Sequence, residues 1–140
     1  MKLRIDVDDR AVKAALDEFA KRVSNLQPAM QQAGLYMERE TKLNFARESD
    51  PDGKPWAALK AATLKRKRST AILRETSTLA GGIALTSTTN TRATVAATAG
   101  GEYGIFHAKG TRKMAARQFI GIGDRHVPRI RKIFENHLKL

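Results

Sequence analysis

The sequence contains no cysteine, which excludes disulfide bonds, thiolate nucleophiles and cysteine-ligated zinc or iron–sulfur sites. Aromatic residues are few, at 6% with one tryptophan, and none interleaves with the basic runs, as stacking on nucleic-acid bases would require. No apolar run approaches the roughly 20 residues that cross a bilayer, and the opening residues MKLRIDVDD lack the apolar region of a signal peptide. These absences predict a chain with no cofactor and no membrane segment.

Acidic residues are scarce in only one part of the chain. Residues 1–59 carry ten Lys/Arg and ten Asp/Glu, whereas residues 60–140 carry sixteen Lys/Arg and four acids. The formal net charge of +12 therefore comes entirely from the second part. Such an asymmetry indicates an acidic partner, which could be nucleic acid, a membrane surface or a negatively charged protein, or else a basic surface that is simply solvated.

The apolar periodicity predicts two N-terminal helices that together make the core. After a strand-like start at residues 3–7, Asp8 or Asp9 is a suitable N-cap for the first helix. Its apolar stripe consists of Val12, Ala15, Leu16, Phe19, Val23 and Leu26. Pro28 suits the first turn of a second helix from residue 28 to about 47. One side of that helix carries Met30, Ala33, Met37, Thr41 and Phe45.

The remainder predicts a small sheet between helices. Residues 58–69 are typical of a short basic helix, and residues 83–87 and 93–97 alternate as two strands around the turn residues TTNT. A last helix is expected from 125–128 to 138, with Val127, Ile130, Phe134 and Leu138 facing the core. The fold class is therefore α+β: one domain over residues 1–140, with two N-terminal helices, a small antiparallel sheet with a hairpin, and a C-terminal helix.

Residues 48–56, ESDPDGKPW, allow three interpretations. A calcium loop is disfavoured because Leu59 stands where an EF-hand needs a bidentate glutamate. A metal-dependent nuclease needs acids and a lysine presented together from adjacent strands, and these acids crowd a turn with two prolines. The favoured interpretation is structural: a tight turn followed by residues that cap the core. The residues with this predicted role are Asp50, Pro51, Asp52, Gly53, Pro55 and Trp56.

The histidines give no sign of a catalytic or metal site. His107, His126 and His137 lie far apart in the sequence, without a partner at helical spacing or a nearby acid in a ligand-like pattern. The glycine pairs in AGGI and TAGGE lack the lysine and the spacing of a phosphate-binding loop. We therefore predict neither catalytic nor metal-binding nor cofactor-binding residues.

Several motifs in fixed order give the chain a family resemblance. They are FARESDPDGKPWAAL, TLKRK, ILRETSTL, YGIFHAKG and AARQFIG, which together cover roughly residues 40–121. In this order they resemble the phage virion morphogenesis family of Mu-like and P2-like phages, the tail-completion and head–tail joining proteins. Two segments depart from the family pattern. Thr76-Ser77-Thr78-Leu79 lacks the usual Thr-Gly, and Ala115-Ala116-Arg117-Gln118-Phe119 lacks both prolines of Pro-Ala-Arg-Pro-Phe.

The resemblance implies a structural protein rather than an enzyme. It implies a place at the tail–neck region of the virion, and in the host cytoplasm during assembly. The implied partners are further copies of the chain in a hexameric or other ring, tail-tube proteins, and neck or connector proteins. DNA passing through the ring would be a further partner. The alternatives are a basic DNA-binding module and, less favoured by the motifs, a hydrolase.

The residue predictions follow from the charge asymmetry and from the resemblance. The residues expected at a partner or subunit interface are Arg112, Lys113, Arg117, Phe119, Arg125, Arg129 and Lys132. Within the motif YGIFHAKG, the residues expected to be structural are Tyr103, His107 and Gly110.

Overall fold

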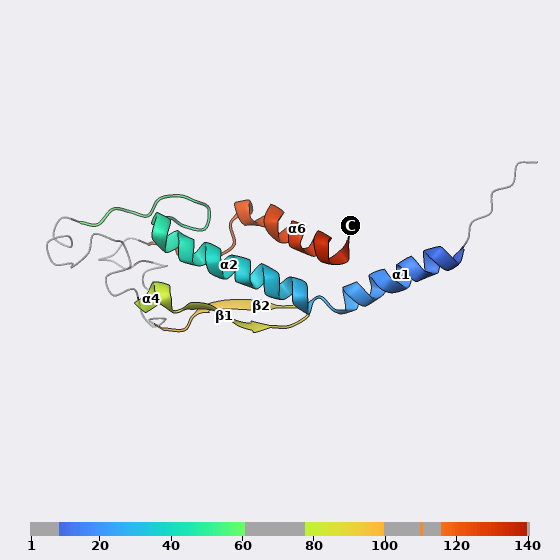
Figure 1. Cartoon of the computed structure of the whole chain (residues 1–140). Coiled ribbons are helices and arrows are strands. Elements are labelled where there is room, and N and C mark those ends of the chain that lie inside the picture. Colours follow the sequence, from blue (N-terminus) through green and yellow to red (C-terminus); the bar gives the residue numbers. More distant parts are fainter. Residues whose placement is uncertain (1–8, 61–77, 100–109, 111–115, 140) are drawn as a thin grey trace, which may run out of the picture.

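The computed structural model describes residues 9–60, 78–99, 110 and 116–139, and its elements confirm the α+β class (Figure 1). In chain order they are the helices α1 (Asp9–Ser24), α2 (Gln27–Arg47) and α4 (Thr78–Gly81), the strands β1 (Ile83–Thr88) and β2 (Ala93–Ala97), the 3-10 helix η1 (Asp124–His126) and the helix α6 (Val127–Leu138). The predicted strand-like start and residues 61–69 of the predicted basic helix lie outside the described residues, and residues 58–60 are not helical.

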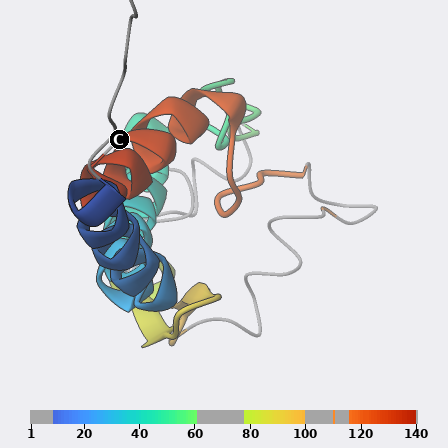
Figure 2. The ribbon, with the colours of Figure 1, turned by 90° about the vertical axis from the view of Figure 1, so that its right-hand side faces the viewer.

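Helix α2 is the middle layer of the molecule. The β1–β2 hairpin packs against one side of it and α6 against the other, as two perpendicular views show (Figures 1 and 2). The predicted inward side is confirmed, because Ala33, Met37, Thr41 and Phe45 are all buried. Gly34 allows the hairpin to come close, since a Cβ there would lie 2.5 Å from Leu85 Cδ1.

The core consists of two apolar clusters along α2. The first lies near the C-terminal end of α2 and contains Phe45, Trp56, Leu79, Ile83 and Phe119. The second joins the N-terminal half of α2 to α6 and contains Ala29, Ala33 and Ile133. Trp56 therefore lies in the core, as expected from its position after the turn.

The hairpin has the predicted strands but an irregular register. Ile83 pairs with Ala97 and Leu85 with Val95, after which the register shifts between Leu85 and Ser87. This bulge places one extra residue in β1, so the inward–outward alternation changes phase. Ser87, expected on the same side as Ile83 and Leu85, is exposed for that reason.

Helix α6 begins and ends close to the predicted limits but turns a different residue inward. Ile133 is only 6% exposed, whereas Val127, which was expected to face the core, is 41% exposed. Ile130, Ile133 and Phe134 lie at spacings of three and one along the helix and share the face that meets α2. Val127 lies at the start of the helix and outside this face.

Helix α1 contradicts the expectation that both long helices make the core. Every side chain from Arg10 to Lys21 is exposed, and the helix points away from the body (Figure 1). The predicted apolar stripe exists, but its members remain open to solvent: Val12 is 49%, Leu16 61%, Phe19 39% and Val23 44% exposed.

Polar contacts fix the direction in which α1 leaves the body. Asn90, in the turn of the hairpin, accepts a hydrogen bond from the Gln27 amide at 3.0 Å and donates one to the Ser24 carbonyl at 3.2 Å. His137 of α6 lies with Nε2 at 3.0 Å from the Arg22 carbonyl and 2.7 Å from the Asn25 carbonyl. The end of α1 and the start of α2 are thus tied to both layers that flank α2.

Candidate functional site

The loop at residues 48–56 is a turn held by its own backbone. Glu48 ends α2 in a left-handed conformation (φ 53°), and the Gly53 amide donates to the Asp50 carbonyl at 2.9 Å. The Asp50 carboxylate accepts hydrogen bonds from the amides of Asp52 (3.0 Å) and Lys54 (2.8 Å). Gly53 has φ of +86°, which favours glycine. Residues 50–53 thus form a turn in the structure.

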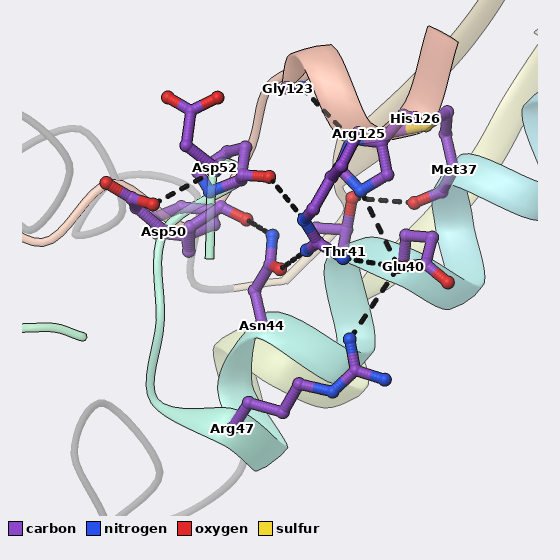
Figure 3. Close-up of polar contacts among 12 residues, drawn as sticks. Met37, Glu40, Thr41, Asn44, Arg47, Asp50, Asp52, Gly123, Arg125 and His126 are labelled. Carbon is purple, nitrogen blue, oxygen red and sulfur yellow. Dashed lines mark hydrogen bonds and ion pairs between the residues drawn. The ribbon is translucent and has the colours of Figure 1, made fainter. Parts of the chain in front are cut away.

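Arg125 fastens this loop to α2 (Figure 3). Its Nε donates to the Pro51 carbonyl at 2.8 Å, while its two terminal nitrogens donate to Glu40 Oε2 and Asn44 Oδ1, each at 3.3 Å. A planar guanidinium can serve three acceptors in fixed directions, which a lysine ammonium cannot do with the same geometry. We call Arg125, Glu40, Asn44 and His126 the polar cluster.

His126 is the fully buried member of the polar cluster. Its Nδ1 accepts a hydrogen bond from the Gly123 amide at 3.0 Å, so the ring carries its proton on Nε2 when neutral. That Nε2 lies 3.5 Å from Glu40 Oε2 and has no hydrogen-bond partner within the described part of the chain. Burial lowers the pKa of His126, the charge of Arg125 lowers it further, and Glu40 opposes both. The imidazole is therefore held neutral at neutral pH.

Two further side chains hold the segment that follows residue 115. Asn44 donates to the Phe119 carbonyl at 2.9 Å, and Trp56 Nε1 donates to the Gln118 carbonyl at 2.7 Å. The Trp56 ring meets Phe45 edge-on at 5.6 Å, and Phe45 contacts Phe119 at 5.2 Å between centroids. These contacts fix residues 118–119 against α2 and Trp56.

The geometry offers no reaction centre among the residues that the structure describes. In the polar cluster Glu40 accepts a hydrogen bond from Arg125, and His126 accepts one from the Gly123 amide. No group of three His, Asp or Glu side chains could hold a metal ion in the described ranges. The arrangement joins residues 40–56 to residues 118–119 and 123–126, which are far from them in the sequence.

The residues expected at an interface are placed very differently from one another. Phe119 is 3% exposed and belongs to the core, where no partner can reach it in this fold. Arg117 donates to the carbonyls of Ala57 (2.9 Å) and Ala58 (3.2 Å), and Arg125 is committed to the polar cluster. Arg129 and Lys132 are exposed on α6 and available to a partner.

The remaining predicted residues fall mostly outside the described ranges. These are Arg112, Lys113, Tyr103 and His107. Gly110 is described and has φ of +75°, a conformation that favours glycine. Pro55 is exposed and forms an isolated antiparallel bridge with Ser49, so the bridge closes the base of the loop.

An open apolar groove of about 520 Å³ lies against α2. It is lined from α2, the hairpin, residues 120–122 and α6, among others by Ala33, Met37, Val95, Ile122, Ile130 and Phe134. Arg92 is the only charged residue among the described residues that line it.

The sequence analysis missed Glu40 and Asn44. Both are buried on α2, although neither residue type is usually buried without a partner. The sequence does contain a sign of their burial. Glu40 and Asn44 are four residues apart, so they lie on the same side of the helix, and each directly precedes an inward residue, Thr41 or Phe45. Polar residues on the core side of a helix indicate a buried network, but not which distant residue completes it.

Comparison with known proteins gives one match. Residues 7–139 match the sequence model of the phage virion morphogenesis family. No curated protein and no solved structure matches the chain. No helix within the described ranges is long and apolar enough to span a membrane.

Proposed function

The chain belongs to the phage virion morphogenesis family and is thus a phage structural protein of virion assembly, and we propose that it acts at the junction of tail and neck. There it completes the tail as an oligomeric ring and allows heads to join. The observation that carries this proposal is the extent of the family match, which covers residues 7–139 of the 140. The partners are tail-tube proteins on one side and neck or connector proteins on the other, and no catalysis is required.

The arrangement of the polar cluster supports a role as a building block. A component that joins two larger assemblies must keep its conformation when force is applied to it. Hydrogen bonds of Arg125, Asn44 and Trp56, all buried or partly buried, connect residues 44–56 to residues 118–125. Hydrogen bonds of this kind between separate segments restrict the backbone to one arrangement.

The test is deletion of the gene in a phage that carries it, followed by electron microscopy of the lysate. We expect full heads and separate tails, with tails of abnormal or unfinished ends, and restored particles when the gene is supplied in trans. Joined particles in normal number without the gene would overturn the proposal.

Exposed basic residues of α6 give a second, narrower test. Arg129→Glu with Lys132→Glu should leave the fold intact, because both side chains are exposed, and should reduce joining through loss of attraction to an acidic partner. The control is Lys60→Glu, also exposed. Equal phage yields from the wild type, the double variant and the control would show that the α6 charges are solvated surface.

The alternative of a DNA-binding module rests on the charge of the second part of the chain. It predicts retarded DNA mobility that falls steeply with salt, because each neutralised phosphate releases a counterion. Binding that persists at physiological salt, with normal head–tail joining in the deletion, would favour the alternative. A ring could also pass DNA through a basic lumen. The protein would then retard DNA, and deletion of its gene would also prevent head–tail joining.

A further inference from the structure

Two apolar surfaces lack a packing partner among the residues that the structure describes. One is the stripe of α1, formed by Val12, Leu16, Phe19 and Val23. The other is the groove beside α2, whose rim includes Ile122, 67% exposed. Contiguous exposed apolar surfaces often mark interaction sites in soluble proteins. A convex stripe and a concave groove are complementary in shape and in chemistry.

The stripe of α1 cannot reach the groove of its own chain in this arrangement. Met30 and Gly34, in the first half of α2, line the groove, and α1 extends from that end of α2 away from the body (Figure 1). Folding α1 back would require a reversal at residues 25–26. That reversal would break the contacts of His137 with the Asn25 carbonyl and of Asn90 with the Ser24 carbonyl.

Helix α1 also needs a partner for its own stability. It has 16 residues, and isolated helices near this length are marginal in water unless an apolar face is packed. Its described hydrogen bonds to the body lie at its C-terminal end, where His137 meets the Arg22 carbonyl and Asn90 meets the Ser24 carbonyl. The apolar stripe on the preceding turns remains exposed.

We propose that α1 of one copy lies in the apolar groove of a neighbouring copy. The proposal rests on the proposed function in one respect, the assumption that copies form a ring. A stripe on one subunit and a groove on the next make a head-to-tail contact, which generates a ring when the rotation closes. Each subunit then gives one α1 and receives another.

Each contact is small, and a ring repeats it. A helix of 16 residues is roughly 24 Å long and 10–12 Å wide, so half of its accessible surface is on the order of 500 Å². The groove loses less, because Ala33, Met37 and Thr41 in its α2 wall are already 9% exposed or less. A single contact is therefore below the roughly 1,000 Å² of a stable interface. In a ring every subunit makes two such contacts.

Pairing of α1 with α1 is the competing arrangement. The stripe residues are spaced four, three and four apart, as in a coiled-coil seam. The stripe covers only about two heptads, however, and an independent coiled coil needs more. Such a pair would also be two-fold symmetric, would leave the groove open and would not extend to a ring.

The absence of cysteine makes a cross-linking test direct. Leu16→Cys on the stripe and Ile122→Cys at the groove are made as separate, differently tagged variants, coexpressed, and treated with a short bifunctional maleimide. Both positions are exposed, so neither variant should lose its fold. With one cysteine in each chain, a product that carries both tags can arise only between copies. We expect this mixed product to dominate.

The matched control replaces Ile122→Cys with Leu35→Cys, on α2. Leu35 is 50% exposed but is not among the residues that line the groove. An equal yield of mixed product from this control would overturn the proposal. So would a predominance of Leu16→Cys homodimers, which would show that α1 pairs with α1, or cross-linking of Leu16→Cys mainly to a tail-tube protein in particles.

A second measurement separates this inference from the proposed function. Leu16→Asp with Phe19→Asp should yield a folded monomer by light scattering, with the fluorescence of Trp56 unchanged. A ring that persists in this variant would overturn the docking of α1 and leave the ring proposal standing. Normal head–tail joining in a gene deletion would overturn the proposed function, whatever the cross-linking shows.

Discussion

Arg125 Nε donates a hydrogen bond to the Pro51 carbonyl at 2.8 Å and so joins two segments that are 74 residues apart in sequence. The same guanidinium reaches Glu40, whose side chain is only 11% exposed, while Arg125 itself remains 34% exposed. The loop after α2 and the start of α6 are thus held by one side chain that also neutralises a nearly buried acid. The geometry gives this residue a structural role within the chain.

Replacing Arg125 should therefore destabilise the fold. Arg125→Ala should lower the free energy of unfolding by about 1.5–3 kcal/mol, because it removes charge-assisted hydrogen bonds and leaves Glu40 with weaker partners. Arg125→Lys should lose most of the same amount. Urea unfolding followed by the fluorescence of Trp56 measures this. Arg129→Ala, exposed on α6, is the control and should change stability by no more than about 0.5 kcal/mol.

The buried His126 should make stability depend on pH. Its pKa is lowered in the folded state, mainly by burial and then by Arg125, so between that value and about 6.5 the unfolded chain binds a proton that the folded chain does not. Stability should accordingly fall as the pH drops below about 6.5. His126→Gln should flatten this part of the profile in urea unfolding at a series of pH values. Identical slopes for both proteins would exclude His126 as the cause.

Gly123 allows η1 to approach the loop. A Cβ at this position would collide with the Pro51 carbonyl and lie 2.8 Å from Asp52 Oδ1. Gly123→Ala should therefore cost about 1–3 kcal/mol by overpacking, measured by thermal unfolding. Gly81→Ala is the matched control, since nothing lies within 4 Å of a Cβ there. Equal stability of the two variants would mean that the loop at residues 48–56 can move away from the added methyl group at no cost in free energy.

Trp56 should be needed for the fold rather than for binding. Trp56→Ala should cost about 3–5 kcal/mol because it removes a buried ring next to Phe45 and the hydrogen bond to the Gln118 carbonyl. Trp56→Phe keeps most of the apolar volume and should cost less. Thermal unfolding followed by circular dichroism compares the stability of the two variants with that of the wild type. A stable Trp56→Ala protein that fails only in head–tail joining would make this side chain a partner contact instead.

Local patterns in the sequence predicted the helices and the hairpin well. The spacing of Met37, Thr41 and Phe45 identified the inward side of α2, and the composition of residues 50–53 identified the turn. Both depend on interactions between neighbours in sequence. The bulge in β1 was missed because one extra residue in a strand leaves no mark in a six-residue alternation.

Relations between distant segments could not be predicted in the same way. The stripe on α1 has the periodicity of a packed helix, but periodicity does not say whether the packing partner is the same chain or another. The charge asymmetry and the family resemblance predicted Arg125 and Phe119 at an interface, whereas Arg125 lies in the polar cluster and Phe119 in the core. Only the three-dimensional arrangement separates these cases.

The contacts of Asn90 at the hairpin turn bear on the curvature of an assembly. Asn90 holds the last turn of α1 and the first amide of α2 at once, and together with His137 it sets the angle between α1 and the body. If α1 links neighbouring copies, that angle contributes to the rotation from one copy to the next. A rotation that divides a full circle closes a ring of fixed copy number, and a small error in it produces an open spiral. The diameter of the whole assembly would then depend on two side chains at this joint.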